Sequence, residues 1–204
     1  MRTKIIIGLV LGLLLISNFA FAGLPWDFKP GKEPDGFSGI KWGTDISTLP
    51  DMEYVSTDPS DEVDIFQIYK KKNDELKMGG AVLEKINYGF WRRKKVFIFD
   101  YVNIYIKGYV NWVGLRDVLF EKFGQGYQES KHPEEYTWLG ETTNMRLRYN
   151  EHTKKGNLWI TSTKIHDQQE EYYNKQKEKG WAAEDAYSYI PVKEPPIPVK
   201  GATP

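Results

Sequence analysis

Histidines and paired carboxylates are the residues of this chain that could perform catalysis, but their spacing argues against it. His132, His152 and His166 are scattered, and none has the HExxH spacing of a zinc site. Glu134 and Glu135 are adjacent, so on an extended chain their carboxylates point to opposite sides and form a poor pair for glycoside hydrolysis. The sequence therefore predicts no catalytic residue, no metal ligand and no cofactor.

Other catalytic signatures are also missing from the sequence. It contains no G-x-S-x-G elbow, Walker loop or dinucleotide fingerprint, and no cysteine for thiol, redox or zinc chemistry. Four carboxylates gather in one segment, at Asp58, Asp61, Glu62 and Asp64. They lack the spacing and the glycine of an EF-hand, which favours a solvated loop over a calcium site. An enzyme stays the alternative interpretation, because catalytic residues need not be close in sequence.

Aromatic residues are the remaining candidates. Trp, Tyr and Phe make up 15% of the chain, so they either fill the core or leave a patch open to a partner. The second interpretation places a binding surface on the aromatic face of one hairpin, beside two arginines. Its candidate residues are Tyr88, Phe90, Trp91, Arg92, Arg93, Phe99 and Tyr101. If Trp26 and Phe28 cover this face instead, the site must lie elsewhere.

The hairpin that would position these residues is predicted from β-forming side chains. Residues 82–91 and 96–107 are rich in Val, Ile, Tyr and Phe, and the cationic residues 92–95 form the loop between them. Placing Trp91 opposite Val96 sorts the side chains into two faces, because they alternate with a period of two. The aliphatic face carries Ala81, Leu83, Val96, Ile98, Val102, Ile104 and Ile106. The aromatic face carries Ile86, Tyr88, Phe90, Phe97, Phe99, Tyr101 and Tyr105.

An amphipathic helix is predicted directly after this hairpin. Asn111 is a suitable N-cap, and Trp112, Leu115 and Leu119 recur at helical spacing. Gly124 is the expected end, since glycine tolerates the backbone conformation that closes a helix. We expect this helix to pack on the aliphatic face of the hairpin.

A second hairpin is predicted over residues 145–165. Pairing Asn150 with Asn157 places the apolar residues on the core face, namely Met145, Leu147, Tyr149, Leu158 and Ile160. The opposite face then carries Arg146, Arg148, Trp159 and Thr161. In this register Arg148 lies across from Trp159, where a guanidinium stacks on an indole for about 0.5 to 1 kcal/mol.

Residues 1–22 have the layout of a secretory signal peptide. A cationic start precedes twelve apolar residues, and Ala20 and Ala22 supply an A-x-A cleavage site. Twelve residues are too few to cross a bilayer, which takes about twenty. We therefore expect a mature chain that begins at Gly23, is periplasmic or extracellular, and has no stable membrane insertion.

The rest of the chain is predicted to form one domain with extensions. Residues 23–36 are an extended Pro/Gly-rich segment, 37–166 a single domain, 167–180 a polar helix and 181–204 a proline-rich disordered tail. The expected fold class is α+β, with a mainly antiparallel sheet, one packed amphipathic helix, a polar C-terminal helix and the tail.

Six short motifs follow one another in an order that resembles a known group of proteins. They are FSGIKWGTDISTLPDM, INYGFW, LFEKFGQGY, YTWLG, LRYN and GNLWITSTKI. The group consists of small exported proteins of Gram-negative bacteria that share an F-x-G-I-x-W-G opening, a G-F-W turn, a Y-x-W strand and an L-x-Y-N hairpin. The resemblance covers Phe37 to Ile165. The group has no assigned activity, so the resemblance implies an exported single domain and no site residue.

These observations predict a non-catalytic exported binding or protein-interaction module. Its expected partner is an envelope protein or a cell-wall glycan. Without the signal peptide the chain has 26 Lys and Arg against 28 Asp and Glu, a formal charge of −2, so we expect no nucleic acid partner. A small periplasmic hydrolase with an unrecognised carboxylate or histidine site is the alternative.

Overall fold

The computed structural model describes residues 28–178, apart from 59–64, 129–130 and 132–133. The chain divides into two units, one ending at His166 and the other beginning at Asp167. The predicted signal peptide and the tail at 181–204 lie outside the described residues. No described helix is both long enough and apolar enough to cross a membrane.

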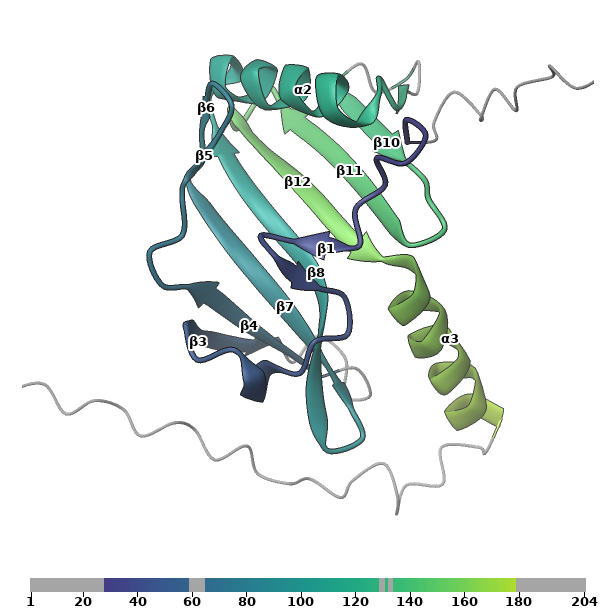
Figure 1. The fold of residues 1–204 in the computed structure, drawn as a ribbon. Helices are drawn as coiled ribbons and strands as arrows, with labels where there is room; N and C mark the ends of the chain where they lie inside the picture. The colour runs from purple at the N-terminus through teal and green to yellow at the C-terminus, as the bar shows by residue number, and fades with distance from the viewer. Residues whose placement is uncertain (1–27, 59–64, 129–130, 132–133, 179–204) are drawn as a thin grey trace, which may run out of the picture. The chain divides into compact units, whose positions relative to one another are not determined.

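The first unit is built on an eight-stranded antiparallel sheet with the order β3-β4-β7-β8-β12-β11-β10-β9 (Figure 1). Its strands are β3 (Met52–Asp58), β4 (Phe66–Lys71), β7 (Lys85–Arg93), β8 (Val96–Lys107), β9 (Tyr127–Gln128), β10 (Glu135–Trp138), β11 (Thr143–Asn150) and β12 (Lys155–Ser162). Two short pairs join β1 (Gly36–Phe37) to β2 (Ile40–Lys41), and β5 (Lys77–Met78) to β6 (Ala81–Val82). The helices are the 3-10 turn η1 (Ile46–Thr48), α2 (Tyr109–Phe123) and α3 (Thr163–Glu178). The predicted α+β class is confirmed.

The turn between β7 and β8 is shorter than predicted. Arg93 pairs with Val96, so the turn has two residues and Trp91 lies opposite Ile98. Lys94 takes a positive φ of 57°, as tight hairpin turns require. This difference of two residues by itself would leave every side chain on its predicted face.

A β-bulge at Asp100 changes those faces. Phe90 pairs with Phe99, but Gly89 pairs with Tyr101, so β8 has one more residue than β7 at this point. One extra residue inverts the alternation beyond it. Phe99 therefore shares a face with Val102, Ile104 and Ile106. The predicted separation of an aliphatic from an aromatic face is wrong.

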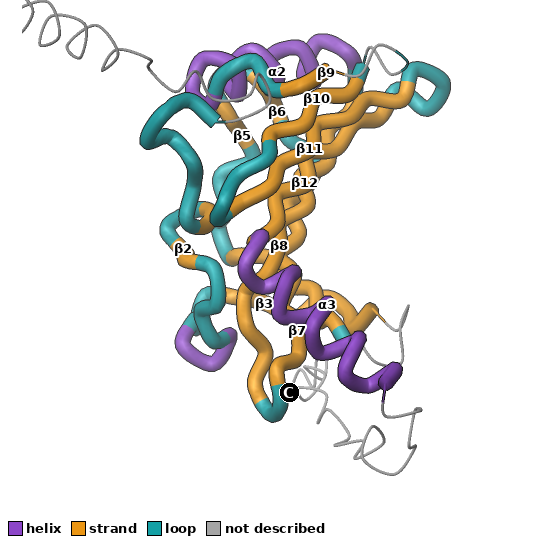
Figure 2. The backbone as a smooth tube through the Cα atoms, turned by 90° about the vertical axis from the view of Figure 1, so that its right-hand side faces the viewer, coloured by secondary structure: helices purple, strands orange, loops and turns teal. Residues whose placement is uncertain are grey.

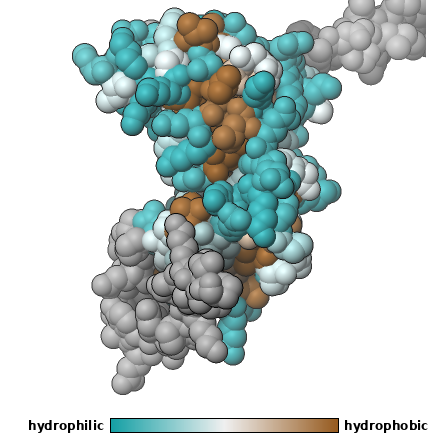
Figure 3. Space-filling view, turned by 90° about the vertical axis from the view of Figure 1, so that its left-hand side faces the viewer, coloured by the Kyte–Doolittle hydropathy of each residue, from teal (hydrophilic) through white to brown (hydrophobic). Residues whose placement is uncertain are grey.

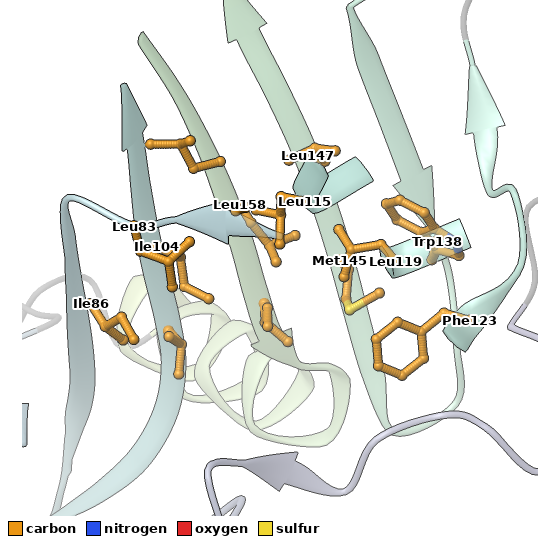
Figure 4. Close-up of a cluster of buried hydrophobic side chains, with 14 of the residues drawn as sticks. Leu83, Ile86, Ile104, Leu115, Leu119, Phe123, Trp138, Met145, Leu147 and Leu158 are labelled. Carbon is orange, nitrogen blue, oxygen red and sulfur yellow. The ribbon is translucent and has the colours of Figure 1, made fainter. Parts of the chain in front are cut away.

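The main hydrophobic core lies on one face of the sheet, which we call the closed face. Helix α2 packs on it against β6, β8 and β11, and Figure 2 shows α2 lying across one end of the strands beside β5 and β6. Its buried residues are Trp112, Leu115, Leu119 and Phe123. In Figure 4, Leu115 and Leu119 lie over Leu147, Met145 and Leu158 of the sheet. The prediction of a packed amphipathic helix is confirmed.

The two ends of α2 differ in how well the sequence predicted them. Gly124 does end the helix, with a φ of 98° and its N–H donated to the Phe120 carbonyl. The predicted N-cap is wrong, because the helix begins after Gly108. Asn111 instead accepts a hydrogen bond from the N–H of Val82 at 3.1 Å and so connects the helix to β6.

The part of the closed face beyond α2 is covered by the segment 36–52. The centroids of the Phe37 and Tyr88 rings are 5.9 Å apart, and those of the Trp42 and Phe99 rings are 4.8 Å apart. Backbone hydrogen bonds join Phe99 to both Gly43 and Thr44. Phe28 does not take part in this cover as the sequence suggested, because it packs on Phe123 at the end of α2. Trp26, the other residue suggested as a cover, lies outside the described residues.

The β11–β12 hairpin confirms the predicted faces and corrects the predicted register. Asn150 pairs with Lys155, two residues from the expected partner, and a shift of two keeps each residue on its face. The five predicted core residues, Met145, Leu147, Tyr149, Leu158 and Ile160, are all buried. Arg146, and not Arg148, lies across from Trp159.

Helix α3 begins at Thr163, four residues before the predicted polar helix, and is described to Glu178. Its first residues belong to the first unit, where Ile165 is buried against Trp91 and Ile98. Within the second unit, Glu171 and Lys175 form an ion pair along the helix surface.

Candidate functional site

The predicted binding residues do not form one exposed patch. Tyr88, Phe90 and Phe99 are 0% exposed, because the bulge places Phe99 in the core and rings of the segment 36–52 pack on Tyr88 and Phe99. Burial and a hydrogen bond to Asp74 raise the pKa of the Tyr88 hydroxyl far above its ordinary value. These three rings cannot touch a partner in this structure, so the expectation that they form an open surface is wrong.

The other four predicted residues differ in how far they are buried. Trp91 is 4% exposed, in a small cluster with Ile98 and Ile165. Arg92 is half-buried, and Arg93 is exposed beside the hairpin turn. Tyr101 is half-buried and lies on the opposite side of the sheet from Phe99. Among the predicted rings, only Tyr101 reaches the surface described next.

The side of the sheet opposite the core, which we call the open face, carries exposed and polar side chains. Around Trp159 its members are Lys85, Asn87 and Gly89 of β7, Tyr101, Asn103, Tyr105 and Lys107 of β8, Lys155, Asn157, Trp159 and Thr161 of β12, Asn144, Arg146, Arg148 and Asn150 of β11, Glu135 and Thr137 of β10, and Tyr127 of β9. They alternate along each strand with the residues of the closed face.

An exposed tryptophan forms the centre of the open face. Trp159 is 41% exposed, and its ring stacks on that of Tyr101 with centroids 5.2 Å apart and planes 26° apart. The Tyr101 ring lies over Gly89, where an added Cβ would come within 2.2 Å of it. On another side the ring of Phe66 contacts Tyr101 at 5.6 Å. Glycine on β7 thus makes room for Tyr101, and Tyr101 holds Trp159 in place.

The Tyr101 hydroxyl is kept neutral by its surroundings. Burial raises the pKa of this hydroxyl well above its ordinary value, and the negative charges of Asp58 and Asp100 raise it further. The ring beneath Trp159 therefore stays uncharged even in alkaline solution, where the hydroxyl of an ordinary tyrosine ionises.

Two arginines flank the tryptophan, and they differ in how firmly they are held. Arg146 donates a hydrogen bond from Nε to Oε1 of Glu135 at 2.7 Å, and its Nη2 forms an ion pair with the same oxygen at 2.7 Å. Arg148 lies further away, with its Nε 3.7 Å from Oε2 of Glu135. Both arginine side chains are 56% exposed. No described residue accepts a hydrogen bond from the Arg148 guanidinium, which leaves its donors available to a ligand.

An amide network orders the third side of this site. Asn157 donates to Asn103 at 3.3 Å, and Asn103 donates to the Tyr105 hydroxyl at 3.0 Å. Asn103 is buried, whereas Asn157 is half-buried and reaches the surface. The network uses the Asn157 amide nitrogen and so directs that side chain, while its carbonyl oxygen stays available as an acceptor.

These groups surround a shallow depression of about 560 Å³. Its walls include Thr137, Arg146, Arg148, Asn157, Trp159 and Thr161. An aromatic platform beside hydroxyl, amide and guanidinium groups is suited to binding a polar ligand that has one apolar face.

The predicted stacking of Arg148 on Trp159 is not present. Arg148 lies across from Asn157, and none of the cation–π contacts in the described residues involves Trp159. The partner of the indole is the Tyr101 ring. The prediction failed because the hairpin turn has four residues, from Glu151 to Lys154, and not the six that the expected register implied.

A carboxyl group on the other side of the sheet has a buried oxygen without a hydrogen-bond donor among the described residues. This oxygen is Oε2 of Glu134. Burial raises the pKa of this carboxyl, the charge of Glu151 raises it further, and Arg116 opposes the change. The Tyr149 hydroxyl, on the residue whose N–H binds the Glu134 carbonyl, is likewise buried without a partner among the described residues.

The predictions about metal ligands are only partly covered by the structure. Asp61, Glu62, Asp64 and His132 lie outside the described residues. His152 and His166 are exposed. Within the described residues, no group of three or more His, Cys, Asp or Glu side chains is placed to hold a metal ion.

A second exposed feature is apolar. Val82 and Val110 are 53% and 84% exposed near the junction of β6 and α2. Figure 3 shows hydrophobic residues in a narrow band on this side of the molecule, bordered by hydrophilic ones. Apolar residues in small numbers are common on protein surfaces, so the open face is the stronger candidate.

In comparisons with protein-family models, curated proteins and solved structures, nothing matches this chain. The candidate site therefore depends on the geometry of the open face alone.

From the sequence, the side chains of this site were assigned to a surface face but were not proposed as binding residues. Arg146, Arg148 and Trp159 were all placed on the non-core face of the second hairpin. The signal that would have selected them is a large indole on a strand face whose other residues are polar, because such a ring has no core to fill.

Proposed function

We propose that this protein is an exported, non-catalytic binding module that binds a partner in the cell envelope through the open face. The observation that carries this proposal is the exposed Trp159, which is stacked in advance on Tyr101 at the edge of a depression. A ring that is already ordered loses little conformational freedom on binding, so its contact area is used efficiently. The signal-peptide pattern of residues 1–22 supports export.

The groups around Trp159 support binding over catalysis. The carboxylate among them, Glu135, is engaged by Arg146 and approached by Arg148. A general acid or base needs a proton that it can exchange with substrate. The depression therefore offers recognition groups, and its carboxylate serves to position arginines.

The test is capture of purified peptidoglycan and envelope extract by the mature chain. Trp159→Ala should abolish capture, because it removes the platform. Tyr109→Ala is the matched control: Tyr109 is 46% exposed and also stacks on a tryptophan, Trp112, but lies on α2. Capture that survives Trp159→Ala, or that is lost equally in both variants, would refute the open face as the binding surface.

A hydrolase is the second candidate, and the Glu134 carboxyl is the observation that favours it. A carboxyl whose pKa is raised by burial stays protonated to higher pH and is suited to general acid catalysis. In a screen against envelope glycans and peptides, an enzyme should lose its activity with Glu134→Gln and keep its melting temperature. Absence of turnover by the unaltered chain on all of these substrates would reject this candidate.

A further inference from the structure

We propose that the open face binds an acidic glycan, a polysaccharide whose sugar units carry carboxylates. This inference rests on the proposed function, because it assigns a ligand class to the same surface. Three observations support it. They are the positive charge of the open face, the hydrogen-bond donors of Arg148 that no described residue accepts, and the aromatic platform formed by Trp159.

The open face is cationic although the whole chain is balanced. The sequence holds 28 basic and 28 acidic residues. Around Trp159, however, the open-face residues named above on β7, β8, β12, β11 and β10 include five cations and one carboxylate, Glu135. The cations are Lys85, Lys107, Lys155, Arg146 and Arg148. Such a surface raises the local concentration of anionic ligands, so charge complementarity selects an acidic partner.

Arg148 is the residue placed to recognise a carboxylate. Glu135 accepts a hydrogen bond from the Arg146 Nε at its Oε1, which also forms an ion pair with the Arg146 Nη2, and its Oε2 is 3.7 Å from the Arg148 Nε. That distance is too long for a hydrogen bond. A ligand carboxylate could accept two parallel hydrogen bonds from the Arg148 guanidinium, the geometry that this group favours.

The platform beside Arg148 suits a sugar ring. A pyranose has an apolar face of C–H groups that packs on the electron-rich face of an indole, while its hydroxyls point outward around the ring. Asn157 and Thr137 line the same depression and provide acceptors and donors for those hydroxyls. Trp159 would thus hold the ring, and Arg148 would bind its acidic substituent.

The spacing of the exposed rings argues against single-stranded nucleic acid, the other common polyanion. Single-stranded nucleic acids are bound by several aromatic rings on which successive bases stack. On the open face Trp159 and Tyr127 are 41% and 45% exposed, and Tyr101 supports Trp159. Strands β11 and β10 lie between the two exposed rings, so they stand roughly 14 Å apart, too far for successive bases to stack on both. Amides and hydroxyls around one ring match a sugar with many hydroxyls better than a row of bases.

The experiment measures binding of oligosaccharides to the mature chain by calorimetry. The probes are oligomers of alginate, polygalacturonate and hyaluronate, each beside its carboxyl-reduced, neutral counterpart, together with a single-stranded oligonucleotide of equal charge. We expect at least one acidic oligomer to bind about tenfold more tightly than its neutral counterpart, because a charge-assisted pair is lost on reduction. Binding should weaken as salt is raised.

Two arginine variants separate a specific contact from general attraction. Arg148→Gln should weaken binding of the acidic oligomer about tenfold and leave the neutral oligomer unchanged. Arg93→Gln also removes one positive charge, but at the turn end of the β7–β8 hairpin. Arg93 pairs with Val96, which is nine residues along β8 from Tyr105 and so roughly 30 Å away from it. This variant should change binding less than twofold. Equal losses in both variants would overturn the role of Arg148.

The outcomes distinguish this inference from the proposed function. Equal binding of acidic and neutral oligomers, both abolished by Trp159→Ala, would reject the acidic class and keep the open face as a binding surface. Tighter binding of the oligonucleotide would replace a glycan with a nucleic acid. Binding of no acidic oligomer would overturn the inference, while capture of an envelope partner that is sensitive to Trp159→Ala would still support the proposed function.

Discussion

The closed and open faces of this sheet are made by neighbouring residues of the same strands, yet they have opposite characters. On β12, Leu158 and Ile160 are at most 4% exposed, whereas Trp159 between them is 41% exposed. Each face also has a stacked Trp–Tyr pair, but Trp112 is buried beneath Tyr109 on the closed side. The difference teaches that residue type did not decide exposure. It was decided by α2 and the segment 36–52, which cover one face.

The largest difference between the faces should appear in stability. Phe99 and Tyr101 are two residues apart on β8, and Phe99→Ala should lower the free energy of unfolding by about 3 to 5 kcal/mol, because it opens a cavity in the core. Tyr101→Ala should cost about 1 to 2 kcal/mol, since that ring is half-buried. Urea denaturation measures both values. Equal losses would mean that the two faces are buried alike.

The cover of the closed face should depend on one buried threonine. Thr143 accepts a hydrogen bond from Trp42 Nε1 at 2.7 Å and donates one to the Pro34 carbonyl at 2.6 Å. Thr143→Val keeps the shape but leaves both groups unpaired, which should cost about 2 to 3 kcal/mol. Thr153→Val, in an exposed turn, should change stability by less than about 0.5 kcal/mol. If the two variants unfold at the same urea concentration, the segment 36–52 is held by other contacts.

Adding a side chain at Gly89, beneath the Tyr101 ring, should affect ligand binding more than folding. Gly89→Ala would place a Cβ 2.2 Å from the Tyr101 ring, and this overpacking should cost about 1 to 3 kcal/mol. The displaced ring should change the fluorescence of Trp159 and weaken ligand binding. Gly80→Ala, where an added Cβ meets nothing within 4 Å, is the control. Unchanged fluorescence and affinity in Gly89→Ala would show that Tyr101 does not position Trp159.

The smallest effect on stability should come from removing the carboxylate of the open face. Glu135→Gln should cost less than about 1 kcal/mol, since the arginines that it holds are more than half exposed. It should raise the affinity for an acidic oligosaccharide several-fold, because Glu135 competes with the ligand for Arg146 and Arg148. Glu53→Gln, which removes an exposed carboxylate paired with Lys70, should leave that affinity unchanged. A decrease with Glu135→Gln would mean that Glu135 helps binding, by positioning Arg146 and Arg148, more than it competes with the ligand for them.

Much of the fold was predictable because its signals are local. Apolar alternation placed the core face of the β11–β12 hairpin correctly even though the register was wrong by two residues, since such a shift preserves faces. Helical spacing identified the buried side of α2, and Gly124 marked its end. The N-cap was missed because Asn111 bonds to β6, a contact between segments distant in sequence.

The candidate site was not predictable to the same extent, and the reason is one bulge. With regular alternation, Phe99 and Tyr101 would share a face, which is why both were assigned to one binding patch. The extra residue at Asp100 sends Phe99 to the core and Tyr101 to the open face. At this bulge the Gly43 N–H donates to the Phe99 carbonyl, and the Phe99 N–H donates to the Thr44 carbonyl. Pairings of that kind between distant segments leave no periodic signal.

By itself, the sequence determined the α+β class, the main hairpins, the packed helix and which residues of β11 and β12 face away from the core. These properties follow from side-chain periodicity and glycine positions, which act within a few residues. Only the tertiary structure decided which aromatic rings stay exposed and which arginine keeps free donors. Those outcomes depend on which segment covers which face and on how one carboxylate is shared between two arginines, and both arise from contacts between residues far apart in the chain.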